Sequence, residues 1–127
     1  MTEPSSEVDG LTVSVDRVLY RRGGPGVPDD TPHVFVYFLT IRNDSKRVVT
    51  LLGRKWLVGQ SNGERKVIEG DKIVGQTPTI APGEHFSYNS FHLVSESSTA
   101  VGSFHGVDQF KQKIHTRIPR FKMTVPD

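Results

Sequence analysis

The sequence predicts an all-β domain, an antiparallel β-sandwich of the immunoglobulin or fibronectin type III type. Short runs of alternating apolar and polar residues recur roughly every ten residues, and residues that favour turns separate them. The chain has 12 glycines and 8 prolines, which supply those turns. No long stretch shows the apolar period of an amphipathic helix. At 127 residues the chain fits one such domain, which we place at residues 11–127.

The first strand is expected between Leu11 and Tyr20, with an irregularity in its middle. Apolar residues alternate with polar ones up to Val15, but from Val18 onward they fall on the opposite phase. A bulge or bend at residues 16–17 would bring both halves onto one face. The glycines and prolines of residues 21–32 then predict a loop.

The middle of the chain predicts the core strand and two hairpins. The stretch His33 to Asn43 is rich in β-branched and aromatic residues and apolar on both faces for most of its length. Residues 43–45 favour a turn, and we expect them to join this strand in a hairpin to a strand at residues 48–52. A further strand is expected at residues 54–60. The Asn62-Gly63 pair predicts the second hairpin, with a type I′ turn, because both residues tolerate positive φ.

The remaining strands follow the same pattern of turns and alternation. Pro82 and Gly83 predict a tight turn before a strand at residues 86–90, one face of which is apolar. Strands at residues 101–107 and 114–125 complete the sandwich. Pro119 confines the last of these to an edge or a bulge, because proline has no N–H to donate to a neighbouring strand.

Composition excludes several classes of protein. The chain has no cysteine, which rules out disulfides and thiolate metal sites and favours an intracellular, cytoplasmic location. Residues 1–10 carry acidic and small polar residues where a signal peptide has a basic start and an apolar run, and we expect them to form a flexible N-terminal tail. No apolar run approaches the roughly 20 residues that cross a bilayer, so we expect no membrane association.

The charge distribution does not indicate nucleic-acid binding. Sixteen basic and fourteen acidic residues give a net charge of +2. Basic residues gather in residues 42–55 and 108–127, where apolar residues separate most of them. This pattern is typical of a solvated strand face, so we expect no specific nucleic-acid site.

Several motifs are similar, in order and spacing, to those of the ApaG family, and the resemblance covers nearly the whole chain, Leu11 to Pro126. The motifs are TIRN at residues 40–43, LLGRKW at 51–56, SNG at 61–63, IVGQTPTIAPGEHFSYNS at 73–90 and GSF at 102–104. The resemblance implies an ApaG domain with a fibronectin type III or immunoglobulin-like sandwich. Bacterial members of the family are associated with cobalt resistance, magnesium efflux and a diadenosine-tetraphosphatase operon. Related domains in eukaryotic F-box and polymerase-delta-interacting proteins look like protein-interaction modules.

The turn between Gly70 and Gly75 is a candidate anion-binding site. ApaG proteins often carry Gly-x-Gly-x-x-Gly there, a pattern that suggests a phosphate or pyrophosphate site, but Lys72 replaces the middle glycine in this chain. In dinucleotide enzymes that motif needs the middle glycine and a helix N-terminus, so we expect these glycines to serve turns at positive φ. The alternative is that Arg54 and Lys72 offer charge to an anion beside Gly70 and Gly75.

Trp56 is the only tryptophan and lies two residues after Arg54, so both side chains leave one face of a strand. A lone tryptophan in an immunoglobulin-like fold is typically a core residue between the sheets, and we favour that interpretation. If Trp56 is exposed instead, Arg54 and Trp56 are candidate residues for contact with a protein partner.

The sequence indicates no metal, cofactor or catalytic site. The five histidines show no close pairing that would ligate a metal; they are His33, His85, His92, His105 and His115. There is no cysteine nucleophile and no Gly-x-Ser-x-Gly elbow, so we do not expect an enzyme.

The leading hypothesis is a cytoplasmic, non-enzymatic binding module that engages a protein partner. A phosphate- or pyrophosphate-binding protein linked to nucleotide metabolism is the alternative, and a hydrolase is the third. Open sheet edges also allow a homodimer, with Pro119 and its basic neighbours limiting uncontrolled pairing.

Overall fold

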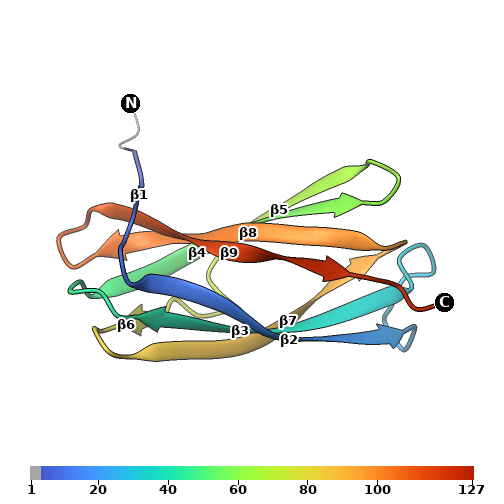
Figure 1. The fold of residues 1–127 in the computed structure, drawn as a ribbon, viewed down its shortest axis with the longest axis horizontal. Helices are drawn as coiled ribbons and strands as arrows, with labels where there is room; N and C mark the ends of the chain where they lie inside the picture. The colour runs from blue at the N-terminus through green and yellow to red at the C-terminus, as the bar shows by residue number, and fades with distance from the viewer. Residues whose placement is uncertain (1–3) are drawn as a thin grey trace.

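The computed structural model describes residues 4–127, and within them the fold consists of two β-sheets packed face to face (Figure 1). The larger sheet has the strand order β1-β9-β8-β4-β5, with β6 pairing to β4, and the smaller has the order β2-β3-β7. The strands are β1 (Ser6–Glu7), β2 (Leu11–Arg22), β3 (His33–Asn43), β4 (Val49–Gln60), β5 (Arg65–Asp71), β6 (Thr79–Ile80), β7 (His85–Val94), β8 (Ser98–Asp108) and β9 (Lys113–Met123). The predicted all-β sandwich is confirmed. Over residues 4–127 no helix is present that could span a membrane.

The irregularity predicted in the first strand is a bulge in β2. Its register against β3 shifts between Val15 and Arg17. Val13 and Val15 face the core before the shift, and Val18 and Tyr20 pack against the core after it. One extra residue therefore keeps two apolar runs of opposite phase on the same face of the sheet.

The hairpin predicted at residues 43–45 is wrong, because the chain changes sheets there. β3 belongs to the smaller sheet and β4 to the larger. The side-chain amide of Asn43, fully buried, donates to the carbonyls of Arg47 at 2.7 Å and Ile80 at 2.8 Å. Its side-chain oxygen accepts the N–H of Ser45 at 3.0 Å, so one residue ties the corner to the β6 region.

The two strands expected at residues 48–52 and 54–60 form one strand, β4, which pairs with β8 along its length. The register of that pair shifts between Leu51 and Gly53, which accounts for the apparent break in the pattern. A Cβ atom at Gly53 would clash with the ring of His105 on β8, so a larger residue at this crowded position would displace that ring.

The hairpin at Asn62-Gly63 is confirmed, but its turn type differs from the prediction. Positive φ occurs at Gly63 (93°) and not at Asn62, which excludes type I′. The Gly63 N–H donates to the Gln60 carbonyl at 3.0 Å, and the Gln60 N–H donates to the Glu64 carbonyl at 2.8 Å. This is a three-residue loop with Gly63 in the left-handed region. The side chain of Asn62 accepts the Glu64 N–H at 2.9 Å, which favours this turn over type I′.

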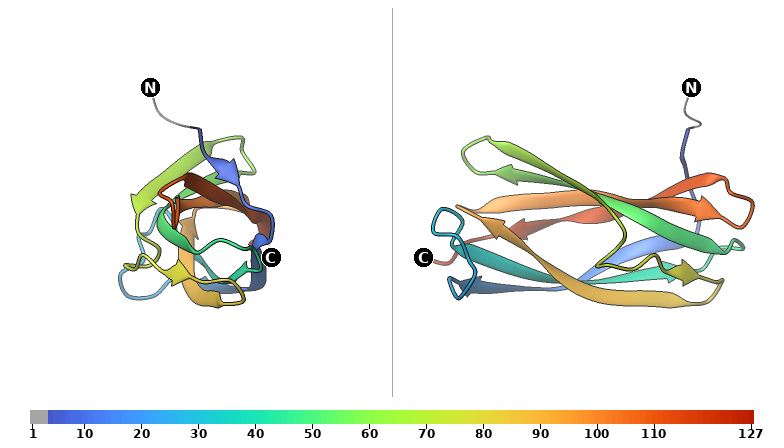
Figure 2. Two further views of the ribbon diagram at one scale, coloured as in Figure 1. Left: turned by 90° about the vertical axis from the view of Figure 1, so that its left-hand side faces the viewer. Right: turned by 180° about the vertical axis from the view of Figure 1, so that it is seen from behind.

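The β4–β5 hairpin extends away from the smaller sheet, whereas the N-terminal segment lies against the larger one (Figures 1 and 2). Ser6 and Glu7 pair in parallel with Ile114 and His115 of β9, and Val8 is buried. The packed structure therefore begins before the boundary predicted at Leu11, because an apolar side chain and a short ladder attach this segment to β9. Residues 1–3 of the predicted tail lie outside the described part of the chain.

The core fills the space between the two sheets. Its largest fully buried side chains are Trp56, Phe104, Leu39, Ile41, Leu51, Ile73, Ile114, Ile118 and Met123. On β9 the register against β8 shifts between Ile118 and Phe121, which places Pro119 in a bulge as predicted. Each sheet has one face packed against this core and the other face turned outward.

Candidate functional site

Arg54 holds the turn that follows β5. Its Nη1 donates to the backbone carbonyls of Asp71 and Lys72, both at 2.8 Å. The guanidinium lies so close to Gly70 that a Cβ atom there would come within 2.9 Å of Nη1 and Nη2. Gly70 does not have positive φ, so the prediction that it serves a turn is wrong, and its function is to leave room for Arg54.

Lys72 adopts a backbone conformation that favours glycine. Its φ is 68°, in the left-handed region, and its N–H donates to the Leu52 carbonyl at 2.7 Å. Gly75 also has positive φ, 76°, as predicted. Ile73 between them is fully buried and exchanges two backbone hydrogen bonds with Gln76, so this segment is a tight turn anchored in the core.

A hollow of about 430 Å³ lies beside Arg54 on the larger sheet. Its lining residues are Arg54, Lys55, Glu69, Gly70, Asp71, Ser103 and His105. The structure therefore brings together Arg54 and Gly70 of the predicted anion site, but Lys72 and Gly75 do not line the hollow. Lys55 pairs with Glu69 at 3.4 Å, and Asp71 adds a second carboxylate. These two carboxylates oppose the binding of an anion.

Trp56 is not available to a partner. Only 1% of its surface is exposed, and its ring packs against Tyr37, His92 and Phe121 at centroid distances between 4.7 and 5.9 Å. The interpretation of Trp56 as the core residue between the sheets is confirmed, and its candidacy as a contact residue is wrong. Arg54 is partly exposed, but its Nη1 is already engaged by the backbone.

The histidines lie in different environments. Within residues 4–127 no three His, Asp or Glu side chains come together in a way that could hold a metal ion. His92 is buried among aromatic rings, and this burial lowers its pKa to about 4. His105 and His115 face each other across β8 and β9, a pairing that their spacing in the sequence did not indicate.

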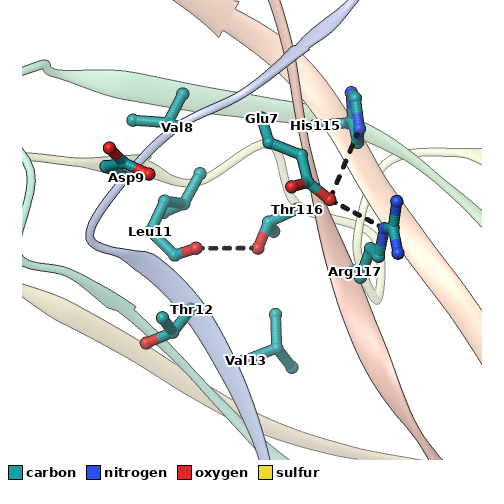
Figure 3. Close-up of a pocket in the computed structure, with 9 residues that line it drawn as sticks. All are labelled: Glu7, Val8, Asp9, Leu11, Thr12, Val13, His115, Thr116 and Arg117. Carbon is teal, nitrogen blue, oxygen red and sulfur yellow. Dashed lines mark hydrogen bonds and ion pairs between the residues drawn. The ribbon is translucent and has the colours of Figure 1, made fainter.

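A pocket of about 240 Å³ lies where the N-terminal segment passes between β2 and β9 (Figure 3). The carboxylate of Glu7 pairs with Arg117 at 2.7 Å and with His115 at 3.9 Å, and the hydroxyl of Thr116 donates to the Leu11 carbonyl at 2.9 Å. These polar groups satisfy one another. Their arrangement joins the edge of the larger sheet to the start of β2.

The outer face of the smaller sheet carries an apolar patch. Strand register places Leu19, Val36 and Phe91 in one row across β2, β3 and β7. Phe91 is 57% exposed and Leu19 38% exposed. The neighbouring rows add three further apolar side chains, Val34, Phe38 and Leu93. We call these six residues the β2–β3–β7 patch. Phe91 and Leu19 are its exposed members, Val36, Phe38 and Leu93 are half-buried, and Val34 is buried. No other strand layer packs on this face of the smaller sheet (Figure 1).

Charged and polar side chains border the β2–β3–β7 patch. Arg17 and Arg21 flank Leu19 on the same face of β2, are exposed, and make no ion pair within residues 4–127. Beyond Phe38, Asp16 accepts hydrogen bonds from Thr40 at 2.5 Å and Ser14 at 2.8 Å. The hydrogen bond from Thr40, then that from Ser14, lowers the pKa of Asp16.

Sequence reasoning did not identify the β2–β3–β7 patch. The available signal was the apolar character of residues 33–43 on both faces, which was interpreted as a core strand. A strand that is covered on both faces is also apolar on both faces, so the sequence cannot distinguish it from a strand with one open face. Only the tertiary structure shows that the outer face of β3 has no layer packed over it.

Comparison with known proteins agrees with these features. The ApaG domain model matches residues 25–112. The ApaG protein of Enterobacter sp. (strain 638) is 39% identical over 100 residues, covering 78% of this chain and 80% of that protein. The ApaG protein of Yersinia pestis (strain Pestoides F) is 35% identical over 101 residues, covering 79% and 81%. A solved structure described as an ApaA protein from Bordetella pertussis superposes with a TM-score of 0.76 at 27% identity, covering 97% of this chain and 98% of that one. The chain belongs to the ApaG family.

Proposed function

We propose that this ApaG domain is a non-enzymatic module that binds a protein partner through the β2–β3–β7 patch. The observation that supports the proposal most directly is the exposure of Phe91 beside Leu19 and Val36. Large apolar side chains grouped on one sheet face and rimmed by polar residues mark interaction surfaces in monomeric proteins. Aromatic residues, phenylalanine included, are also enriched at protein interfaces.

Phe91 supplies an apolar anchor for a contact at this surface. Burying the exposed part of Phe91, roughly 100 Å², contributes about 2.5 kcal/mol at about 25 cal/mol per Å². Leu19 and Val36 lie in the same row and add to that area. A contact centred on Phe91 thus has an apolar anchor with smaller apolar neighbours around it.

The arginines on β2 define the chemistry of the partner. Arg17 and Arg21 lie at the rim with no carboxylate paired to them in residues 4–127. A partner that places carboxylates beside its apolar side chains complements this rim and gains in association rate and in specificity. The proposed occupant is therefore a protein surface with apolar side chains flanked by Asp or Glu.

The test is a quantitative pull-down from the native host, analysed by mass spectrometry, with matched variants as bait. Phe110 is the control, because it is even more exposed (73%) and lies at the turn between β8 and β9, away from the patch. We expect a partner that is retained by wild type and by Phe110→Ser but lost with Phe91→Ser and weakened by Arg21→Glu. The purified partner should then show the same order of affinities in titration calorimetry.

Two outcomes would contradict this proposal. Retention of every partner by Phe91→Ser removes the patch from the interaction. A concentration-dependent dimer in sedimentation experiments that Phe91→Ser dissociates assigns the patch to a second copy of this chain instead.

Other expectations from the sequence remain predictions. They are the cytoplasmic location, the association with cobalt and magnesium homeostasis, and the absence of catalysis. For phosphate or pyrophosphate at the Gly70–Gly75 turn, Arg54 provides a cation, whereas Glu69 and Asp71 oppose it. We therefore prefer the protein-binding function.

A further inference from the structure

The starting point is Gly59, a strand glycine whose presence the packing does not explain. Glycine weakens a strand, so it usually marks a close approach of other atoms or a positive φ. In β4 and β8, Gly53, Gly102 and Gly106 each lie against neighbouring atoms that leave no room for a Cβ. At Gly59 an added Cβ would meet nothing within 4 Å, and φ is not positive. Neither usual reason for a glycine in a strand applies at Gly59, and the space that a side chain would occupy there is empty.

That space is a hollow of about 170 Å³ on the outer face of the larger sheet. Four adjacent strands build it, because Gly59 of β4 pairs with Arg65 of β5 and with Thr99 of β8, while Arg120 comes from the bulge of β9. Half-buried Leu57 and Val101, which are also cross-strand partners, complete the lining. Arg65 and Arg120 thus border a small cavity whose other lining residues are apolar, glycine or threonine.

The charge in this hollow has one sign. Arg65 and Arg120 make no ion pair within residues 4–127, and no carboxylate is among the lining residues. Lys122, the cross-strand partner of Thr99, lines an adjoining hollow that also contains Gly59 and adds a third cation. This differs from the hollow at Arg54, where Glu69 and Asp71 offset the cations. Guanidinium groups are the preferred protein partners of carboxylates and phosphates.

We propose that the hollow over Gly59 is a second binding site, which accepts an oxyanion on a short aliphatic stem through Arg65 and Arg120. A volume of about 170 Å³ suits one side chain or a short carboxylic acid. Pockets for drug-sized ligands are larger, about 300 Å³ or more. The stem packs on Leu57 and Val101, and the carboxylate lies between the guanidinium groups with the Thr99 hydroxyl in reach. A glutamate side chain of a peptide and a free short-chain carboxylate share this chemistry.

This site is independent of the proposed protein-binding function. It lies on the outer face of the larger sheet, and the β2–β3–β7 patch lies on the outer face of the smaller sheet, across the core. Loss of either site leaves the other unaffected. A domain with two such faces can hold two ligands at the same time.

The experiment is a titration of the ¹⁵N-labelled full chain followed by NMR, with hexanoate, acetate and a glutamate-containing peptide as separate probes. We expect saturable shifts of the Gly59 and Thr99 amides with hexanoate. Acetate should bind at least about tenfold more weakly, because it lacks the stem that contacts Leu57 and Val101. Stronger binding of the peptide than of hexanoate assigns the site to a peptide side chain, and the reverse assigns it to a free acid.

The variants separate binding from folding. Gly59→Val fills the floor of the hollow without a steric clash at its Cβ and should abolish the shifts while the rest of the spectrum stays unchanged. Arg65→Gln should weaken hexanoate binding about tenfold. Arg22→Gln, an exposed position on β2, is the charge-matched control and should bind as wild type. Unsaturable shifts, equal binding of acetate and hexanoate, or full binding by Gly59→Val would each overturn the proposal.

Discussion

The guanidinium of Arg54 lies against Gly70, its cross-strand partner, and Nη1 of that guanidinium donates to the carbonyls of the next two residues in the chain. One side chain thus closes the turn after β5. A methyl group at residue 70 would occupy the space that the guanidinium fills.

Gly70→Ala should lower the free energy of unfolding by about 1 kcal/mol, because it displaces Arg54 from its hydrogen bonds to two solvent-exposed backbone carbonyls. The control is Gly59→Ala, where the added methyl group meets no atoms and stability should be unchanged or slightly higher. Urea denaturation followed by Trp56 fluorescence measures both. Equal midpoints for Gly70→Ala and wild type would show that Arg54 is not held in this way.

Lys72→Gly should stabilise the domain by about 0.5–1 kcal/mol, since a lysine at φ of 68° is strained and glycine is not. The same change at Lys66, within strand β5, should destabilise by a similar amount, because glycine weakens a regular strand. Thermal unfolding measured by circular dichroism should shift in opposite directions for the two variants. A lower melting temperature for Lys72→Gly would contradict the expectation.

Acid should destabilise the domain through His92. Burial, and to a smaller extent the charge of Lys66, lowers the pKa of His92 from its ordinary value of 6.5 to about 4. Between these values the unfolded chain binds more protons than the folded one, so stability is complete above pH 6.5 and falls as the pH drops toward 4. The full loss from this residue is on the order of 3 kcal/mol.

Urea midpoints of wild type, His92→Leu and His85→Gln at several pH values between 7 and 4 would measure this effect. His92→Leu should have a flatter profile than wild type. His85 is exposed on the same strand, so His85→Gln should keep the wild-type profile. If His92→Leu and wild type lose stability in parallel, His92 is not the cause.

Trp56 fluorescence should be shielded from acrylamide in the native protein, because the ring is 1% exposed between the sheets. The quenching constant should be several-fold smaller than that of the urea-unfolded chain, in which the same tryptophan meets solvent. A native constant close to the unfolded one would place Trp56 at the surface and restore it as a contact residue.

Local patterns in the sequence predicted most strands correctly. The change of phase between Val15 and Val18 located the β2 bulge, and the Asn62-Gly63 pair located the β4–β5 hairpin. Both depend on interactions between residues a few positions apart. The corner after Asn43 was missed, because the same turn residues serve a hairpin and a change of sheet, and the choice depends on Ile80, which is 37 positions away.

The candidate sites were predicted less well, because each depends on register. Arg54 and Gly70 were both named as anion-site residues, but their contact shows that the arginine is held by the backbone. The hollow over Gly59 combines residues of four strands that are far apart in the sequence. A pattern of residue types contains no information about such neighbours until the strands are paired.

By itself the sequence determined the fold class, the family and the burial of Trp56, since alternation, turn chemistry and motif order are properties of short stretches of chain. Only the tertiary structure decided which faces are open and which charges meet. The outer face of the smaller sheet exposes Phe91 and Leu19 because no described layer packs on it, and Arg65 and Arg120 line one hollow although β4 and β8 lie between their strands. Both facts arise from pairing across the whole chain, where residues distant in sequence become neighbours.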